Sequence, residues 1–273
     1  MAISRRKFIE YGLYLAGTAV LVDSLWAEQF FIEIKEFNFK NATPENYNLK
    51  ILQLSDLHLK SVNYQLKKLA EKINTIKPDL IVITGDAIEE SSKLTDLDEF
   101  LKLIDVDIKK VAILGNWEYW GEIDIDLLTK MYKSHNCDLL INQNKQYKVN
   151  GEKITITGLD DFIGNKADFK QSIDNIKDSK FHLVLNHCPA YNDEIIKEAH
   201  KRDLTVDLIL SGHTHGGQIN LLGNVLFLPE GSGKYVKGWY KKKGVSMYVS
   251  KGIGTSILPV RFGSRSEVAV FYV

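Results

Sequence analysis

The chain has 273 residues, of which 44% are hydrophobic, enough to bury the core of one large domain. Its 35 Lys and Arg residues balance its 35 Asp and Glu residues, which excludes a broad positive field for binding nucleic acid. Two cysteines in a chain of this length exclude a disulfide scaffold, and we expect Cys137 and Cys188 to be buried small side chains.

Residues 1–28 resemble an export signal. Arg5 and Arg6 precede the uncharged run 11–22, and a basic segment followed by roughly 7–15 apolar residues is typical of signal peptides. Adjacent arginines are the mark of the twin-arginine export machinery. The run is shorter than the about 20 residues of a comfortable membrane span, and residues 25–27 make a poor cleavage site, so cleavage and retention both stay open.

This segment predicts a twin-arginine-type signal or membrane anchor, and it predicts export to the periplasm or the outer face of the cytoplasmic membrane. The export machinery and a membrane surface are then expected partners. Two alternatives stay open: an anchor that faces the cytoplasm, and an ordinary buried or amphipathic first helix.

Residues 29–48 predict an edge strand over 30–37 and a polar turn containing Pro44. The main domain follows over 49–273. In its first part, strands and helices alternate, and Pro78 stops the first helix. The predicted strands are 49–54, 80–84 and 111–114, and the predicted helices are 64–76, 94–104 and 123–134. Three strand–helix units in a row imply right-handed crossovers and a parallel sheet.

The second part of the domain contains a predicted hairpin, because Asn150-Gly151 separates two strand-like segments at 147–149 and 154–157. A helix is predicted over 191–200. Further strands are predicted over 181–185, 206–210, 225–228, 247–250 and 268–273. We expect an α/β fold in which two packed sheets are flanked by helices.

Five short polar clusters each stand at the end of an apolar run. They contain two aspartates, an asparagine and three of the seven histidines at comparable positions, together with a fourth histidine two residues from the first aspartate. Because a parallel sheet gathers the carboxyl ends of its strands at one edge, these side chains are expected to lie close together. The residues are Asp56, His58, Asp86, Asn116, His187, His213 and His215.

These residue types are metal ligands. Asp56 and His58 are one residue apart, so on an extended strand end both side chains would point to the same side; His213 and His215 repeat this spacing. A carboxylate has two oxygens, so Asp86 is able to bridge two cations. Any one cluster alone is more often a surface pair or a turn, but their joint occurrence predicts a metal site.

The ordered set D-x-H, G-D, G-N-x-E, strand-terminal His and G-H-x-H resembles the calcineurin-like metallophosphoesterases over residues 49–273. Residues 216–218, 234–240 and 252–256 are similar to the YkuE-like branch, which often carries twin-arginine or anchoring N-termini. The resemblance implies a two-sheet β-sandwich flanked by helices, in four layers α/β/β/α.

The resemblance also implies the chemistry. One ion would be bound by Asp56, His58 and His215, and the other by Asn116, His187 and His213, with Asp86 bridging. Two divalent ions, Mn, Zn or Fe, would hold a hydroxide that attacks a phosphodiester or phosphomonoester in line. The implied catalytic residues are Asp86, Asn116 and His213.

Trp117 departs from the family pattern, which has a proton-donating histidine after the asparagine. An indole N–H is only a hydrogen-bond donor, and a lost general acid matters most for poor leaving groups. We expect either a low-pKa leaving group or another donor, with His135 and Lys234 as candidates; Trp117 with Tyr119 and Trp120 could instead wall an acyl or aromatic pocket. Predicted substrate-binding residues are Trp117, Gly217, Gln218 and Lys234.

Three readings remain. The first is a hydrolase of a phosphate-ester small molecule or a lipid-linked substrate outside the cytoplasm. The second is a UDP-2,3-diacylglucosamine-type pyrophosphohydrolase of lipid A synthesis, which an anchor facing the cytoplasm would favour and export would exclude. The third is a metal-poor interaction module on the same fold, which would have lost ligands, whereas this chain keeps all seven.

Overall fold

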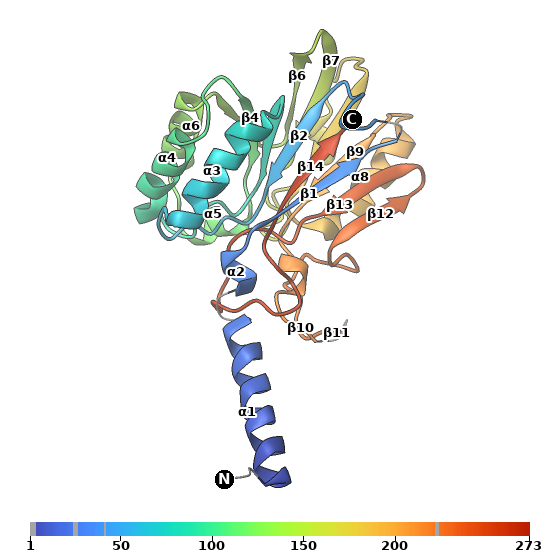
Figure 1. Ribbon diagram of the computed structural model, residues 1–273. Helices are drawn as coiled ribbons and strands as arrows, with labels where there is room; N and C mark the ends of the chain where they lie inside the picture. Colours follow the sequence, from blue (N-terminus) through green and yellow to red (C-terminus); the bar gives the residue numbers. More distant parts are fainter. Residues whose placement is uncertain (1–3, 24–26, 41, 222–223) are drawn as a thin grey trace.

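The computed structural model describes residues 4–23, 27–40, 42–221 and 224–273. Two six-stranded sheets pack face to face, and helices cover their outer sides (Figure 1). The first sheet has the order β1-β14-β2-β3-β4-β5. Its strands are β1 Glu33–Asn38, β14 Glu267–Tyr272, β2 Lys50–Leu54, β3 Leu80–Thr84, β4 Lys109–Ile113 and β5 Cys137–Leu139.

The second sheet has the order β12-β13-β9-β8-β7-β6. Its strands are β12 Gly238–Lys242, β13 Val245–Val249, β9 Leu208–Ser211, β8 Phe181–Leu185, β7 Glu152–Gly158 and β6 Gln143–Val149. A separate ribbon pairs β10 Asn220–Leu221 with β11 Asn224–Val225. Both large sheets are mixed: β14 runs antiparallel to β2, and β12 and β6 run antiparallel to their neighbours.

Strand β3 shows why the sheets are covered on both sides. All five of its residues are buried. Leu80 and Val82 join the apolar cluster between the two sheets, whereas Ile81 and Ile83 join the cluster beneath the helices. A continuous apolar strand therefore supplies two cores at once, as parallel strands buried on both faces do.

Helices α3 Tyr64–Ile76, α4 Leu94–Lys102 and α6 Ile125–Ser134 cover the first sheet, and α7 Phe169–Ser172 and α8 Asn192–Lys201 cover the second. The short helices are α2 Glu28–Phe30, α5 Asn116–Trp120, η2 Ser91–Lys93, η3 Pro189–Tyr191 and η4 His215–Gly217. The four-layer α/β fold expected from the sequence is confirmed, and both cysteines are buried.

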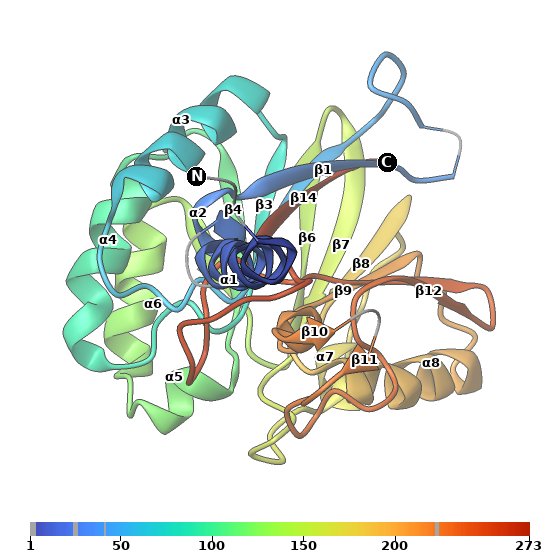
Figure 2. The same ribbon diagram turned by 60° about the horizontal axis from the view of Figure 1, so that its bottom comes forward.

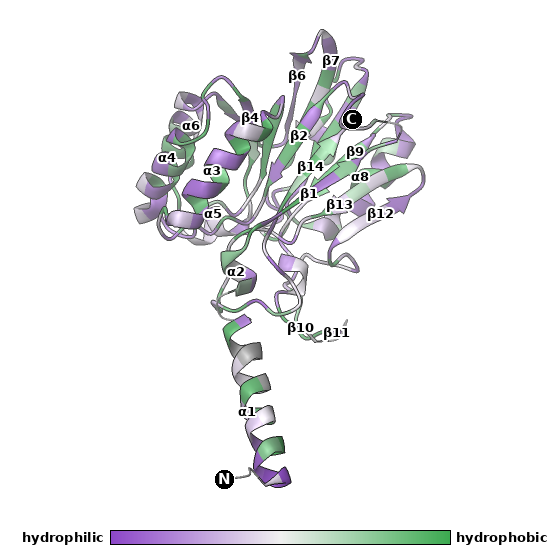
Figure 3. Cartoon of the chain, viewed as in Figure 1, coloured by the Kyte–Doolittle hydropathy of each residue, from purple (hydrophilic) through white to green (hydrophobic). Residues whose placement is uncertain are grey.

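Helix α1, Arg5–Val22, projects away from the two sheets (Figures 1 and 3). In the part of the chain that the structure describes, no helix is long and apolar enough to cross a membrane. Residues 25 and 26 of the weak cleavage site lie outside that part. In place of the edge strand predicted over 30–37, β1 covers Glu33–Asn38 and lies at the end of its sheet beside β14.

Two predictions about the elements need correction. The strand expected over 225–228 is wrong: β11 ends at Val225, and Leu226 and Phe227 are exposed. The sequence also did not predict β5, α7 and β12. The first two are only three and four residues long, and β12 alternates exposed with half-buried residues.

Candidate metal centre

The seven predicted ligands converge at the carboxyl ends of five strands, three from one sheet and two from the other. Asp56 and His58 follow β2, Asp86 follows β3, and Asn116 begins α5 directly after β4. The second sheet contributes His187 after β8, and His213 and His215 after β9. All seven are buried, with at most 4% of their surface exposed.

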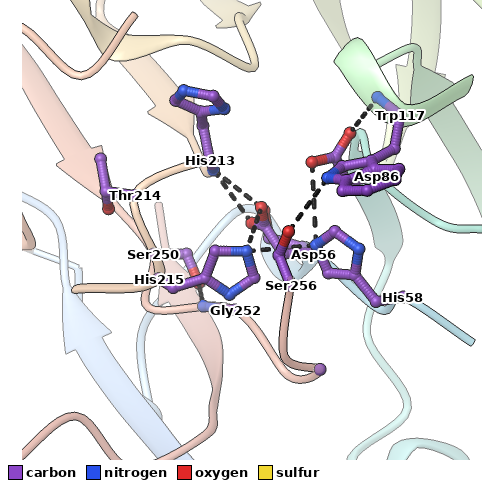
Figure 4. Close-up of polar contacts among 12 residues, drawn as sticks. Asp56, His58, Asp86, Trp117, His213, Thr214, His215, Ser250, Gly252 and Ser256 are labelled. Carbon is purple, nitrogen blue, oxygen red and sulfur yellow. Dashed lines mark hydrogen bonds and ion pairs between the residues drawn. The ribbon is translucent and has the colours of Figure 1, made fainter. Parts of the chain in front are cut away.

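The first group consists of Asp56, His58 and His215. The two Nε2 atoms of His58 and His215 lie 3.1 Å apart, and His215 Nε2 lies 3.6 Å from Asp56 Oδ1. Figure 4 shows these side chains turned toward one another. Nitrogen atoms of two buried imidazoles this close are arranged as they would be around a shared cation.

The second group consists of Asn116, His187 and His213. Asn116 Oδ1 lies 3.2 Å from His187 Nε2 and 3.0 Å from His213 Nδ1, and these two nitrogens are 3.3 Å apart. Ligand atoms about 2.1 Å from an ion stand about 3.0 Å apart in octahedral and about 3.4 Å apart in tetrahedral coordination. The second group has these spacings, so its residues fit a divalent metal ion.

Asp86 lies between the two groups. Its Oδ2 is 3.7 Å from His58 Nε2 and 3.2 Å from His187 Nε2, while its Oδ1 accepts a hydrogen bond from the Trp117 backbone N–H at 2.9 Å. One oxygen is thereby anchored to the protein, and the other faces both groups.

The histidines are oriented by partners on their other ring nitrogens. His187 Nδ1 lies 2.7 Å from the Thr84 carbonyl oxygen, and His213 Nε2 lies 2.6 Å from the Glu230 carbonyl oxygen. His58 Nδ1 lies 2.9 Å from a Glu89 carboxylate oxygen. The carbonyl partners of His187 and His213 fix which nitrogen of each ring carries the proton, so the nitrogen that faces the centre is the one that would present a lone pair to a bound ion.

Burial lowers the pKa of His213 to about 4, and the charge of nearby His187 acts in the same direction. Burial also holds the pKa of His215 well below its ordinary value. Both imidazoles are therefore neutral at physiological pH, which is the form that binds metal. His187 differs, because the effect of burial is outweighed by the charge of Asp86, which raises the pKa of His187 to about 10, so an ion bound there would displace a proton. Cys188 Sγ lies close to the ligand atoms of His187 and His213.

The side chains converge for a different reason than the sequence suggested. Asp56, His58, His213 and His215 all have left-handed backbone conformations, with φ between 42° and 74°. The expectation of an extended strand end is therefore wrong: the strands have ended, and tight turns aim the side chains. Such conformations are costly for residues other than glycine and are typical of functional sites.

Close packing leaves no room for a side chain at Gly85, which precedes Asp86. Its φ is +86°, and an added Cβ would lie 2.6 Å from His187 Nδ1. Glycine at this position lets strand β3 turn directly beneath a ligand from the other sheet.

Glu118 organises two of the turns. Its carboxylate accepts hydrogen bonds from the backbone N–H groups of Asp86 at 3.1 Å, Ala87 at 2.6 Å and Gly115 at 2.8 Å. Burial, together with the charge of Asp86, raises the pKa of Glu118 to about 7. The sequence showed this residue only as the acid of G-N-x-E, although its place in the first turn of α5 is a capping signal.

Trp117 lies beside the centre and does not face it as a proton donor. Its indole Nε1–H donates to Ser256 Oγ at 3.1 Å (Figure 4), and its ring packs edge-on against His58 and Trp120. Ser256 is a site residue that the sequence did not assign. Its own proton is donated to none of the described residues, so it is available to a bound molecule.

A pocket of about 430 Å³ opens above the centre. The predicted residues Gly217 and Gln218 line it, as do Trp117 and Trp120. The other lining residues are Asp86, Asn116, His213, Thr214, His215, Ile219, Leu226, Phe227, Pro229, Glu230, Ser256, Ile257 and Leu258.

Three predicted residues do not line this pocket. Lys234 lies 3.6 Å from Asp193 and is largely exposed, and its role in substrate binding stays a prediction. His135 pairs with Asp98 at 2.7 Å, and Tyr119 donates its hydroxyl to Asp160. Neither is placed to protonate a leaving group or to wall the pocket.

Glu28 supports the centre from the N-terminal side. Its carboxylate accepts the backbone N–H groups of Gly263 at 2.8 Å and Ser264 at 2.9 Å. The Ser264 hydroxyl in turn donates to the carbonyl oxygen of His215 at 2.6 Å. Glu28 thus packs as part of the domain, although the sequence grouped it with the leader.

Several known proteins are similar to this chain. A family model described as calcineurin-like phosphoesterase matches residues 49–217. The chain is 32% identical to the uncharacterized metallophosphoesterase YkuE of Bacillus subtilis over 98% of this chain and 97% of that protein. It is 29% identical to the uncharacterized metallophosphoesterase YkoQ of the same organism, over 84% and 85%. A dimetal phosphatase structure from Danio rerio aligns with a TM-score of 0.45 at 10% identity, over 76% and 88%.

Proposed function

Because the chain belongs to the calcineurin-like phosphoesterase family, we propose that it hydrolyses phosphate esters with two divalent metal ions held by the strand-end cluster. This cluster is the set Asp56, His58, Asp86, Asn116, His187, His213 and His215. The observation that carries the proposal is Asp86, whose Oδ2 faces a histidine nitrogen of each group.

In this proposal Asp56, His58 and His215 hold one ion, Asn116, His187 and His213 hold the other, and Asp86 is shared. When bound, the ions supply Lewis acidity and lower the pKa of water enough for attack on phosphorus at neutral pH. Imidazole, carboxylate and amide donors together favour Mn, Fe or Zn over Mg alone.

The proposal includes a restriction on the leaving group. Trp117 engages its indole N–H with Ser256, and the other proposed donors lie elsewhere. The Ser256 hydroxyl offers a hydrogen bond to the departing oxygen but is too weak an acid to give up its proton. Esters with low-pKa leaving groups are therefore the preferred substrates, as diesters or monoesters.

The two alternatives are less favoured. A pyrophosphate substrate brings a second charged phosphate, yet among the described residues that line the pocket there is no Lys or Arg to receive it. The interaction-module alternative requires a degenerate centre, whereas here all seven residues are buried and converge.

For the compartment, we keep the proposal of export to the outer face of the cytoplasmic membrane through a twin-arginine-type signal over residues 1–28. Arg5, Arg6 and Lys7 stand in the first turn of α1, ahead of its apolar part. Cell fractionation with Arg5→Lys and Arg6→Lys tests it: trapping of the double variant in the cytoplasm supports export, and unchanged distribution contradicts it.

The activity is tested with the purified full-length chain, stripped of metal and reloaded with Mn²⁺. Hydrolysis of bis(4-nitrophenyl) phosphate or 4-nitrophenyl phosphate should appear on reloading. Reloaded protein that binds two ions but cleaves neither ester would contradict the proposal.

A further inference from the structure

One side of the pocket is apolar and open to solvent. Five large side chains there are each more than half exposed, with Ile257 at 78% and Phe227 at 68%. We call them the apolar rim: Trp120, Leu226, Phe227, Ile257 and Leu258. Single exposed apolar side chains are common on protein surfaces, but several gathered at the mouth of a pocket indicate a binding surface.

The loop residues of the rim are held in place by hydrogen bonds within and between the two loops that carry them. Gln218 Nε2 donates to the Leu258 carbonyl oxygen at 2.7 Å, and the Phe262 N–H donates to the Gln218 carbonyl oxygen at 2.9 Å. The Leu226 N–H reaches the Ile219 carbonyl oxygen at 3.3 Å. The apolar side chains thus stay exposed although their backbones are tied together next to His215.

The polar lining of the pocket comes mainly from ligands of the strand-end cluster and Ser256, together with Thr214, Gln218 and Glu230. The cluster and the Ser256 hydroxyl suit the phosphate and the departing oxygen. The rim offers no cation among its described residues and presents Leu, Ile, Phe and Trp surface. A sugar, a nucleotide or a second phosphate would leave its polar groups unpaired there, at a cost in binding.

We propose that the pocket binds a phosphate ester bearing a long aliphatic chain, with the phosphate at the strand-end cluster and the chain against the apolar rim. This rests on the proposed function and adds the class of substrate to it. Each methylene that leaves water for the rim would improve apparent affinity by up to about fourfold.

The position of α1 supports this class. Helix α1 leaves the domain on the side where β10 and β11 lie, in both views (Figures 1 and 2). Leu226 and Phe227 directly follow β11. Leu13 and Leu15 of α1 are also exposed. Apolar surface of the pocket and of α1 therefore occurs on one side of the molecule, where a chain-bearing substrate in a lipid layer would approach.

The test uses alkyl 4-nitrophenyl phosphates with ethyl, butyl, hexyl and octyl groups, because the leaving group is then constant. We expect kcat/KM of the Mn²⁺-loaded full-length chain to rise at least tenfold from ethyl to octyl. Phe227→Ser with Ile257→Ser should flatten this rise to threefold or less. Leu127→Ser, which changes an exposed leucine on α6, is the matched control and should keep the full rise.

The outcomes separate the inference from the proposed function. Hydrolysis that does not depend on chain length, or a rise that survives in the rim variant, overturns the inference and leaves the proposed function intact. Absence of hydrolysis of every ester overturns the proposed function. The role of the rim is then tested by binding alone, with the affinity for octyl phosphate measured by tryptophan fluorescence. Binding no tighter than that of ethyl phosphate overturns the inference.

A second arm places octadecyl 4-nitrophenyl phosphate in phosphatidylcholine vesicles. Cleavage there supports a bilayer as the source of the chain. Cleavage of only the monomeric octyl ester supports the same pocket with a free amphiphile as its ligand.

Discussion

The strand-end cluster and the apolar rim border the same pocket, but the chain builds them differently. The cluster residues are at most 4% exposed and follow five regular strands, whereas the rim residues are more than half exposed and most lie in loops. The cluster side chains His187 and His213 are held by carbonyl partners. The loop residues of the rim are held through hydrogen bonds to their backbones, and Trp120 packs against the ring of Trp117. Catalysis and substrate choice therefore depend on different residues. Substitutions in the cluster should reduce metal binding and turnover, whereas substitutions in the rim should change the preference for the substrate.

The largest effect is expected from Asp86→Asn. The amide keeps the shape but removes the negative charge that both groups face. We expect kcat to fall at least about 10³-fold and the Mn²⁺ content to drop below two ions per chain. Asp138→Asn, outside the pocket, is the control. A variant that keeps two ions and a tenth of the activity would contradict the bridging role.

The next effect is expected from Glu118→Gln. The carboxylate accepts hydrogen bonds from three backbone N–H groups. In Gln, the amide nitrogen replaces one oxygen, so at least one backbone N–H would face another donor and lose its acceptor. Partners behind ligands typically contribute about 10–100-fold to metal affinity or activity. Titration of Mn²⁺ into the stripped variant should show a loss of this size, and unchanged affinity would rule out a positioning role.

Trp117→His tests the restriction on the leaving group at the junction of cluster and rim. A histidine there should raise the rate on dialkyl phosphates about tenfold and leave the aryl ester nearly unchanged, because only the alkoxide needs a proton. The measurement is the ratio of the two rates. An equal change on both esters would end the leaving-group argument.

The smallest effect is expected on stability. Phe227→Ser and Ile257→Ser change exposed side chains, so the free energy of unfolding should stay within about 0.5 kcal/mol of the native chain. Saturating Mn²⁺ at a hundred times its Kd should instead stabilise the fold by about 2.7 kcal/mol per ion. Thermal unfolding with and without Mn²⁺ measures both, and a rim variant that unfolds many degrees lower would show that the rim is structural.

Much of the fold was predictable because local pattern and burial agree. Helix α3 and strands β3 and β8 have the predicted bounds, since α3 is a periodic run that ends before Pro78 and the two strands are short continuous buried runs. The cluster was also predictable, because each ligand follows a strand end. Of the rim, the sequence indicated only Trp120, as a possible wall of an acyl or aromatic pocket. An apolar run at 225–228 predicts a buried strand, and only the placement of β11 shows that Leu226 and Phe227 remain exposed.

The supports of the centre could not be predicted from spacing. Ser256 and Trp117 are 139 residues apart in the chain, and Glu28 lies 236 residues from Ser264. Such pairs leave no local signal. Lys234, a predicted substrate-binding residue, lies 3.6 Å from Asp193 outside the pocket, and no local signal in the sequence indicates this pairing.

The most direct test of the account is the number of metal ions that activity requires. Mn²⁺ is titrated into the stripped full-length chain while bound Mn²⁺ and hydrolysis of bis(4-nitrophenyl) phosphate are measured on the same samples. The account predicts that activity reaches its plateau at two ions per chain and that Asp86→Asn never reaches it. Full activity with one ion, or with none, would contradict it.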